Sequence, residues 1–559
     1  MRIIPALSLL LGLVSAALAQ HFQPSDSPEV TVPVTSPAGM NSFFAANGND
    51  SNPCTQAAPC QTLPKAQSLS YQPGATINFN GGDNFTGCWA LTPTNVSGGG
   101  SASNPIVVQS YGTGVATWTS NCTGDFFPLL DIAGVNGITV QNLRLVGGNP
   151  AANIGILIEG PGDTIAVQNT EITGFAGPDG QASSEIMVLG AGARLSSGCG
   201  ALNHVTIMNN VLHGATPTSH DRNGVYGYGC DRNITNVVYS NNHVYNMGGI
   251  APTNGALSPN GIAFTSVAGG LAEHNLVHDI GANNATCGGP TGIIAYESDS
   301  ITIRFNEAYN VMPVNFTAGC DWVGFDLDGG VTNSIVDYNY GHNNGGACLL
   351  NFPNAGPNIF RYNVCENNDL VTGSRGQIAI NPSLVQVYGN TIYAPPGSNG
   401  SGEPPACIFL GYNGSFATGS FIENNLCDFH RTSQFNISAG ISIGNSDASA
   451  VTAKNNLYSS NVNYWQFNAT VTTTLAATQA AGKEQGSIEA DPLLAAPGTG
   501  ATCGNAVLTT GPQPCPSAYR LQHGSPALGA GISVNNDGGR DYYGNATTLH
   551  NIGADQGAH

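Results

Sequence analysis

Short runs of alternating apolar residues that end in asparagine recur through most of the chain, as in ITVQNLRL at 138–145 and ITIRFNEAY at 301–309. Most of them follow a second short apolar run that starts with glycine or another small residue, such as GILIEG at 155–160. The recurring asparagines are Asn142, Asn169, Asn210, Asn242, Asn275, Asn306, Asn339, Asn363, Asn390, Asn425 and Asn456. They are spaced by about 24 to 41 residues, with no helical period between them. Each repeat therefore predicts three short β-strands.

Repeats of this length cannot bury their own apolar faces, so we expect them to stack on one another. Three strands per repeat, each parallel to its counterpart in the next repeat, predict an all-β fold, a right-handed parallel β-helix. The asparagines would then stack at an internal turn and bond to one another and to the backbone. His213, His278 and His342 each lie three residues after a recurring asparagine. Because they follow the repeat, we expect them to be structural, either by stacking or by hydrogen bonds at the turn.

The two ends of the chain differ from the repeats. Arg2 precedes an apolar run, and Ala17-Leu18-Ala19 has the spacing of a cleavage site, so residues 1–19 are predicted to be a secretory signal peptide. No later segment has eighteen consecutive apolar residues, which predicts a secreted, extracellular protein without membrane contact. The remaining boundaries that we predict are an N-terminal extension at 20–47, an opening region of the β-helix at 48–136, central repeats at 137–460 and a C-terminal capping segment at 461–559.

Cysteine usage supports an oxidising compartment, because the count of 14 is even. The pairing of sequence neighbours predicts the disulfides Cys54–Cys60, Cys88–Cys122, Cys199–Cys230, Cys287–Cys320, Cys348–Cys365, Cys407–Cys427 and Cys503–Cys515. Cys348 and Cys407 occupy equivalent places in their repeats, and Cys365 and Cys427 both follow the recurring asparagine by two residues. We therefore expect these two bridges to staple single turns.

N-linked glycosylation is predicted as well, from many acceptor motifs. The motif Asn-x-Ser/Thr occurs at Asn49, Asn84, Asn95, Asn121, Asn233, Asn284, Asn315, Asn399, Asn413, Asn436, Asn468 and Asn545.

The charge balance limits the partners. Lys and Arg number 14 against 34 Asp and Glu, which gives a net charge of −20. Such a surface repels polyanions, so we expect no nucleic-acid partner. It argues less strongly against acidic polysaccharides. We expect a monomer.

The terminal segments resemble those of the pectate-lyase-like superfamily of secreted, carbohydrate-active β-helix proteins. GNDSNPCTQAAPCQTLPKAQSL at 48–69 is similar to the usual start of such helices, and NIGADQGA at 551–558 is similar to the usual closing segment. The resemblance covers about residues 40 to 559. It implies a polysaccharide substrate in a groove along the first strands of the repeats, but this fold hosts hydrolases, lyases and non-enzymes.

Two aspartates stand close together in WVGFDLDGG at 322–330. The strand alternation places Asp326 and Asp328 on the outer face, with Glu297 at the end of the neighbouring strand. Paired carboxylates at such spacing are the groups that glycoside hydrolysis needs, so these three are the predicted catalytic residues. The predicted substrate-binding residues are Trp322 and Tyr296 as apolar walls, with Asn351, Asn381 and Arg375.

Other interpretations of the same residues remain open. The sequence DLDGG also fits an Asx-type turn, and the carboxylates also fit a bound Ca²⁺, although no cofactor is required. A lyase would draw its cation from Arg222, Arg304, Arg361 or Arg375, and a glycan-binding solenoid without activity is the third possibility. The β-helix β-xylosidases, which this layout resembles, use an Asp and then a Glu on the next turn, where this chain has Asn351. The polygalacturonase motifs are not present either.

Overall fold

The computed structural model describes most of the chain from Asn41 onward. The described residues are 34–35, 41–122, 128–148, 153–176, 183–193, 198–249, 259–283, 290–313, 321–352, 356–371, 376–398, 405–411, 414–444, 446–447, 449–508 and 511–558. The predicted signal peptide and most of the predicted extension therefore lie outside them. No helix among the described residues is long and apolar enough to cross a membrane.

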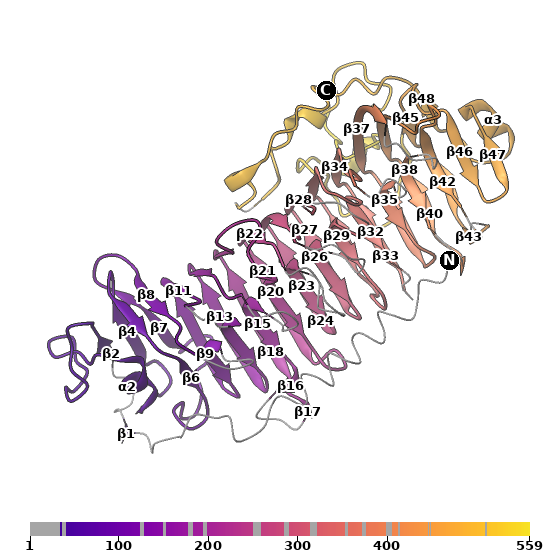
Figure 1. Cartoon of the computed structure of the whole chain (residues 1–559). Helices are drawn as coiled ribbons and strands as arrows, with labels where there is room; N and C mark the ends of the chain where they lie inside the picture. Colours follow the sequence, from indigo (N-terminus) through magenta and orange to yellow (C-terminus); the bar gives the residue numbers. More distant parts are fainter. Residues whose placement is uncertain are drawn as a thin grey trace. The chain divides into compact units, whose positions relative to one another are not determined.

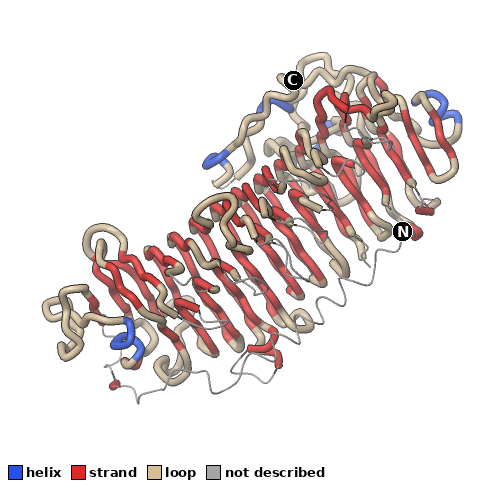
Figure 2. Tube along the Cα trace, viewed as in Figure 1, coloured by secondary structure: helices blue, strands red, loops and turns tan. Residues whose placement is uncertain are grey.

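Three sheets of stacked parallel strands build the protein, which confirms the predicted parallel β-helix (Figures 1 and 2). Residues 1–270 and 271–559 form two compact units, and β24 (Val267–Glu273) contains the boundary. We number the sheets by the order of the strands within a repeat.

In the first unit, sheet 1 contains β6 (Trp89–Leu91), β9 (Pro128–Ala133), β12 (Ile154–Glu159), β15 (Ser184–Leu189), β20 (Asn223–Tyr228) and β23 (Asn260–Thr265). Sheet 2 contains β2 (Ser42–Phe44), β4 (Thr76–Asn80), β7 (Ile106–Tyr111), β10 (Asn136–Gln141), β13 (Gly162–Gln168), β18 (Leu202–Met208) and β21 (Ile234–Ser240). Sheet 3 contains β5 (Asn84–Thr86), β8 (Ala116–Thr119), β11 (Leu143–Val146), β14 (Glu171–Thr173), β19 (Val211–His213) and β22 (His243–Met247).

In the second unit, sheet 1 contains β26 (Thr291–Tyr296), β29 (Val323–Leu327), β32 (Leu349–Asn351), β35 (Gly376–Ile380), β38 (Ala406–Leu410), β42 (Ala439–Ile443), β46 (Tyr464–Phe467) and the antiparallel β47 (Thr470–Thr472). Sheet 2 contains β27 (Asp299–Arg304), β30 (Ile335–Asp337), β33 (Asn358–Arg361), β36 (Val385–Tyr388), β40 (Phe421–Glu423) and β44 (Thr452–Lys454). Sheet 3 contains β25 (Leu276–Ile280), β28 (Glu307–Val311), β31 (Tyr340–His342), β34 (Val364–Glu366), β37 (Thr391–Ser398), β41 (Leu426–Thr432), β45 (Leu457–Tyr458) and β48 (Ile488–Glu489).

The remaining elements are short. Three pairs of small strands lie outside these sheets: β1 (Val34–Thr35) with β3 (Leu69–Ser70), β16 (Ala191–Ala193) with β17 (Gly198–Cys199), and β39 (Gly414–Ser415) with β43 (Ser446–Asp447). Among the described residues the α-helices are α2 (Leu63–Gln67) and α3 (Leu475–Ala480), each with a threonine side chain as N-cap, and three short 3-10 helices lie at Gly504–Ala506, Ser517–Tyr519 and Thr547–Leu549.

Inward side chains stack from turn to turn. In sheet 2, Ile165 of β13 lies beside Val205 of β18, and Val167 lies beside Ile207. All four are buried, and full burial of such a side chain contributes roughly 1.5–3 kcal/mol. The alternation that predicted the strands is thus the alternation between this core and the outer face.

The asparagine ladder is present at the turn from sheet 2 to sheet 3. In the second unit the Nδ2 group of Asn363 donates to Asn390 Oδ1 at 3.0 Å, and that of Asn390 donates to Asn425 Oδ1 at 2.9 Å. Backbone carbonyls accept the other amide hydrogens, so these side chains are satisfied while fully buried. The ladder runs through Asn275, Asn306, Asn339, Asn363, Asn390, Asn425 and Asn456 in this unit, and Asn210 bonds to Asn242 in the first.

Asn142 and Asn169 were wrongly assigned to this ladder. Register pairs Gln141 with Gln168 and Gln168 with Met208, so both asparagines align with Asn209, one residue before Asn210. They occupy the left-handed corner of the turn, with φ of 54° and 51°. Asparagine tolerates that conformation because its short side chain bonds locally.

A second ladder lies at the turn from sheet 3 to sheet 1 and was not predicted. Asn344 Nδ2 donates to Asn368 Oδ1 at 2.8 Å, and the backbone N–H of Asn368 donates to Gln377 Oε1 at 2.8 Å. Each of these asparagines follows the corresponding residue of the first ladder by five positions, which is the signal that the sequence offered.

The outer side of sheet 3 carries stacked rings, as the histidine positions predicted. His213 stacks on Tyr245 at 4.8 Å between ring centroids in the first unit. In the second unit, Tyr309 stacks between His278 at 4.7 Å and His342 at 4.8 Å. These histidines therefore serve the repeat.

Six of the seven predicted disulfides are present: Cys54–Cys60, Cys88–Cys122, Cys199–Cys230, Cys348–Cys365, Cys407–Cys427 and Cys503–Cys515. The predicted pair Cys287–Cys320 lies outside the described residues. Cys348–Cys365 and Cys407–Cys427 each connect sheet 1 to sheet 3 within one turn, as expected.

In the second unit the C-terminal segment after β48 returns along the solenoid, where it is drawn in yellow (Figure 1). Glu307 of β28 is fully buried and accepts hydrogen bonds from the backbone N–H groups of Cys503 at 2.8 Å and Gly504 at 2.9 Å. Further along, Asn424 accepts from the Ile532 N–H at 3.0 Å. The segment therefore covers the outer side of sheet 3 and the corner next to it.

Candidate functional site

Two adjacent strands of sheet 1 carry the predicted acids. In register, Ile294 of β26 lies beside Asp326 of β29. Beyond the strand ends, Asp328 N–H donates to Ala295 O at 2.8 Å and Glu297 N–H donates to Gly329 O at 2.9 Å. The structure therefore brings Glu297 and the two aspartates together on neighbouring turns, at the corner where sheet 1 gives way to sheet 2. We call Tyr296, Glu297, Asp326 and Asp328 the acidic corner.

Asp328 holds the turn that follows β29. Its Oδ1 atom accepts a hydrogen bond from the Gly329 N–H at 2.6 Å, and its carbonyl accepts from the Val331 N–H at 3.2 Å. Gly330 has φ of 78°, a value that glycine adopts without strain. The predicted turn at Asp328 is therefore present, but the backbone closes it and the side chain bonds to the next residue, not two residues on as in an Asx turn. The Gly329 N–H orients a carboxylate that is half-buried at the surface.

The other members of the acidic corner differ in exposure. Glu297 is exposed and stands in the left-handed conformation, with φ of 49°. Tyr296 is half-buried, and its ring edge lies against Gly329. Asp326 is on the opposite side of β29 from the inward Phe325 and Leu327, as predicted, but it is only 2% exposed. Glu297 and Asp328 are therefore the two accessible carboxylates.

Two predicted binding residues are not available to a substrate. Asn351 pairs with the inward Leu327 and is fully buried, where it donates to Ser383 Oγ at 2.7 Å. The residue beside Asp326 is Leu350, so the prediction was displaced by one position along the strand. Trp322 is also fully buried, so its ring presents no face to a sugar.

The last two predicted binding residues contribute less. Asn381 follows β35, is 5% exposed, and lies over Gly411. Arg375 lies outside the described residues.

A buried acid pair in the first unit was not found from the sequence. Glu185 of β15 is fully buried, and the charge of Asp221, which is 2% exposed, acts on it. Burial, together with the nearby Asp221 charge, raises the pKa of Glu185 well above its usual range, and burial also raises the pKa of Asp221. Two buried carboxyl groups with raised pKa values favour a state in which at least one of them is protonated. The residues in register with Glu185 on the two neighbouring turns are Gly155 and Gly224. A glutamate at a position where the neighbouring turns have glycine was the sequence signal for this pair.

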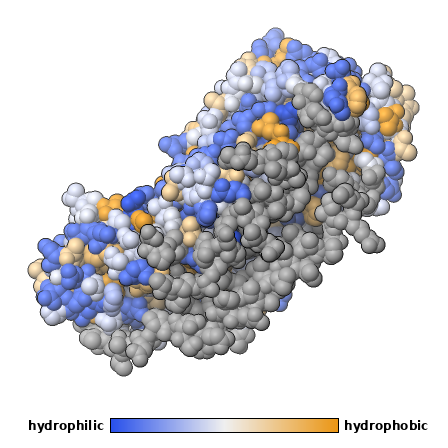
Figure 3. All heavy atoms as spheres, in the orientation of Figure 1, coloured by the Kyte–Doolittle hydropathy of each residue, from blue (hydrophilic) through white to orange (hydrophobic). Residues whose placement is uncertain are grey.

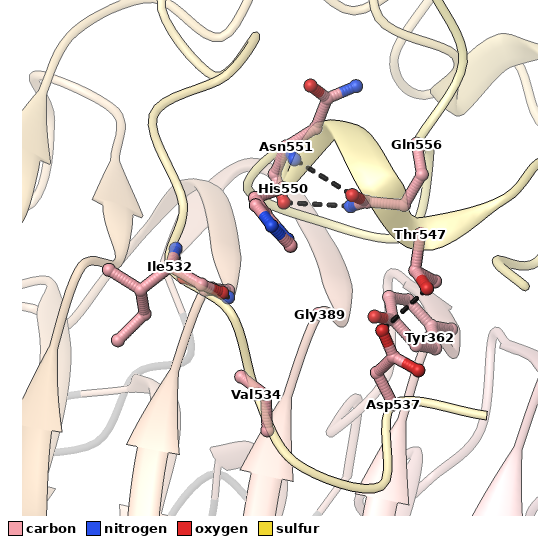
Figure 4. Close-up of a pocket in the computed structure, with 10 residues that line it drawn as sticks. Tyr362, Gly389, Ile532, Val534, Asp537, Thr547, His550, Asn551 and Gln556 are labelled. Carbon is pink, nitrogen blue, oxygen red and sulfur yellow. Dashed lines mark hydrogen bonds between the residues drawn. The ribbon is translucent and has the colours of Figure 1, made fainter. Parts of the chain in front are cut away.

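A small pocket lies under the C-terminal segment (Figure 4). Tyr362 and Gly389 of the solenoid face Val534, Asp537 and other residues of that segment across it. Its cavity volume of about 10 Å³ is on the scale of one water molecule and excludes a sugar.

Apolar residues and possible metal ligands on the described part of the surface are further features that can mark a site. On the face drawn in Figure 3, described apolar residues appear as scattered spots among polar ones. Within the described ranges, no three His, Cys, Asp or Glu side chains are grouped so as to hold a metal ion.

Solved structures that resemble this chain are carbohydrate-active β-helix enzymes. A GH136 lacto-N-biosidase from Eubacterium ramulus is 16% identical, with a TM-score of 0.45 over 64% of this chain and 64% of that one, less than two thirds of the enzyme. Pectate lyase Pel9A is 14% identical, with a TM-score of 0.42 over 92% of this chain and 96% of that one. A variant of the PL6-family alginate lyase AlyGC is 15% identical, with a TM-score of 0.46 over 86% of this chain and 55% of that one.

At such identities and TM-scores the likeness concerns the fold alone. No family model matches the chain, and no curated protein matches it.

Proposed function

We propose that this protein is a secreted glycoside hydrolase that cleaves a neutral or weakly charged polysaccharide at the acidic corner. The observation that carries the proposal is the convergence of Glu297 and Asp328 from neighbouring turns, joined by the Glu297 N–H···O Gly329 hydrogen bond of 2.9 Å. The net charge of −20 disfavours a strongly acidic polymer as substrate.

The spacing of the two turns suits hydrolysis. Adjacent strands lie about 4.8 Å apart, and glycosidases hold their two carboxyl groups roughly 5 to 9.5 Å apart. We assign Asp328, which the Gly329 N–H orients, as the base or nucleophile. We assign the exposed Glu297 as the proton donor to the leaving oxygen. Tyr296 supplies an apolar edge for the sugar ring, and Asp326 behind them acts as a positioning residue.

The arginines favour hydrolysis over β-elimination. A lyase needs a cation to neutralise the uronate carboxylate of its substrate. Arg304 pairs with Glu273 at 2.8 Å, Arg361 pairs with Asp337 at 2.8 Å, and Arg222 is 1% exposed. The fourth candidate for a lyase, Arg375, lies outside the described residues.

The decisive variants change charge while keeping shape. In Asp328→Asn the amide oxygen still accepts from the Gly329 N–H, so the turn is preserved and the carboxylate is lost. We expect kcat on the polysaccharide to fall by at least about 100-fold, the usual contribution of a positioned acid or base. Asp447→Asn is the matched control, because Asp447 is exposed and also accepts from a backbone N–H, that of Ser449 at 2.9 Å.

The role of Glu297 requires a second substrate. Glu297→Gln should lose activity on the polysaccharide by a similar factor, but by less than about 10-fold on an aryl glycoside whose leaving group needs no protonation. The substrate is found first by screening a polysaccharide panel for new reducing ends and for unsaturated products. If Asp328→Asn keeps more than about a tenth of the wild-type rate, Asp328 has a structural role in the turn and no catalytic role. If the products are unsaturated, the protein is a lyase and the hydrolase proposal is wrong.

A further inference from the structure

The asparagines of the glycosylation motifs fall into two structural groups. Four of the twelve, Asn284, Asn315, Asn399 and Asn413, lie outside the described residues. Among the others, one group is exposed, and the second group uses the side-chain nitrogen that would carry the glycan for hydrogen bonds within the protein. The transfer needs this Nδ2 atom, and the sugar attached to it needs solvent around it.

Five of the described motif asparagines are exposed, and three of them, Asn84, Asn436 and Asn468, are placed to carry a glycan. Of the other two, Asn49 accepts a hydrogen bond from the hydroxyl of its own motif residue Ser51, and the motif of Asn121 ends outside the described residues. Asn84 is exposed on the outer side of β5 and Thr86 lies exposed on the same side, whereas Phe85 between them points inward. Asn436 is exposed in the loop after β41, with φ of 61°, next to Phe435 at 65% exposure. Asn468 is exposed at the hairpin between β46 and β47.

Asn233 shows the opposite arrangement. Its Nδ2 group donates to Gly190 O at 2.9 Å and to Gly200 O at 3.0 Å, so both amide hydrogens are used. Its Oδ1 atom accepts from the Cys230 N–H at 2.8 Å. A Cβ atom at Gly190 would lie 2.4 Å from Asn233 Oδ1, so the glycine leaves the room that this side chain fills. Asn233 therefore connects one turn of the first unit to the turn before it.

Asn95 and Asn545 are engaged in the same way. Asn95 is 3% exposed, and its Nδ2 group donates to Ala90 O at 2.7 Å and to Gln67 O at 3.3 Å. Asn545 is half-buried, and its Nδ2 group donates to the carboxylates of Asp541 at 2.8 Å and Asp555 at 3.4 Å. A glycan on either nitrogen would remove a donor hydrogen and displace the groups around it.

We propose that Asn84, Asn436 and Asn468 are N-glycosylation sites, and that Asn95, Asn233 and Asn545 remain unmodified because they are structural. In the transfer, Nδ2 forms a bond to the anomeric carbon of an oligosaccharide, the bond from that carbon to a lipid-linked diphosphate breaks, and one Nδ2 proton leaves. The proposal requires passage through a eukaryotic secretory pathway but is independent of the proposed hydrolysis.

The test is site mapping on the full chain secreted from a yeast host. Enzymatic release of the glycans in ¹⁸O-water converts each modified asparagine into a labelled aspartate, which peptide mass spectrometry locates. We expect the label at Asn84, Asn436 and Asn468 and at none of the three structural positions. Label at Asn95, Asn233 or Asn545 in the secreted protein, or its absence from any of the three exposed positions, would overturn the assignment.

Variants of the Ser or Thr residue of the motif prevent glycosylation without changing the asparagine itself. Thr86→Ala destroys the motif at Asn84 and should remove one glycan. Ser97→Ala destroys the motif at Asn95 and should leave the glycan mass unchanged, and Ser97 is exposed, so the variant should fold normally. Loss of one glycan mass in Ser97→Ala would contradict the proposal.

A bacterial host without the modification tests the structural half. There Asn233→Ala should lower the Tm by at least about 2 °C, because its bonds to Gly190 and Gly200 are lost. Asn84→Ala should leave the Tm unchanged within about 1 °C. Equal Tm values for Asn233→Ala and the parent protein would show that the Asn233 side chain is not structural.

Discussion

Replacing Asn390 by alanine would remove one rung from the asparagine ladder of the second unit. Asn390 is fully buried, and its Oδ1 atom accepts from both the backbone N–H and the Nδ2 group of Asn363, each at 3.0 Å. Its Nδ2 group donates to Asn425 Oδ1 at 2.9 Å and to Phe360 O at 3.0 Å. Alanine makes none of these side-chain bonds, and it leaves a small cavity where the amide group was.

The expected cost follows from these partners. A buried N–H group left without an acceptor costs about 1–3 kcal/mol, and each hydrogen bond lost contributes about 1 kcal/mol net. The unpaired Asn363 N–H and two or three further lost bonds give a loss of about 3–6 kcal/mol in the free energy of unfolding. Denaturant unfolding followed by circular dichroism and by tryptophan fluorescence measures the change.

A control variant lies at the corner of another turn in the same unit. Asn455 stands directly before the ladder residue Asn456, in the left-handed conformation with φ of 51°. At the equivalent corner before Asn390 the chain has Gly389, with φ of 64°. Asn455→Gly should therefore change stability by no more than about 0.5 kcal/mol. A cost below about 1 kcal/mol for Asn390→Ala, or equal costs for both variants, would refute the view that the ladder carries this stability.

Three further outcomes are expected. Because the folded pKa of Glu185 is raised, its contribution to stability is complete below its unfolded pKa and is lost as pH rises through the folded pKa. The Tm of the parent protein should therefore fall from mildly acidic to neutral pH. Glu185→Gln, which leaves Asp221 in place, should make the Tm depend less on pH over this range. Replacing Cys365 by alanine should lower the free energy of unfolding by about 2–4 kcal/mol, measured by denaturant unfolding. A change near zero would show that the ladders hold this turn without the disulfide. Glu307→Gln places an amide against the Cys503 N–H, so limited proteolysis should cut the C-terminal segment faster than in the parent protein, and an unchanged rate would contradict an anchoring role.

The fold was predictable because its main determinants are local and repeat. Alternating β-branched residues define the strands, and a fully buried amide such as Asn339 must find partners in the same place on every turn. The prediction failed at Asn142 and Asn169 because asparagine suits two adjacent positions for different reasons. The first is the left-handed corner, and the second is the ladder, which Thr170 occupies instead, with its N–H donating to Asn210 Oδ1 at 3.0 Å. Residue type alone does not separate these two positions.

The candidate site was predictable only in part. Strand alternation correctly placed Asp326 outside, because that depends on the strand itself. The error at Asn351 arose in the pairing of two strands, where a shift of one residue exchanges the faces. The burial of Trp322 and Asp326 depends on how neighbouring segments pack, which no periodicity in the sequence records.

The residues that lie in register near the start of successive sheet 1 strands show how a departure from the repeat identifies a residue with its own role. At the start of each sheet 1 strand, many turns have glycine, because a Cβ atom would approach sheet 3 or its turn, as at Gly292, where it would lie 3.0 Å from Ala308 Cβ. From β12 to β42, four residues in this row are not glycine. They are Cys348 and Cys407, which form disulfides, Gln377, which continues the second ladder, and Glu185. Glu185 is the titratable member of this row, and because burial and the Asp221 charge raise its pKa, its contribution depends on pH.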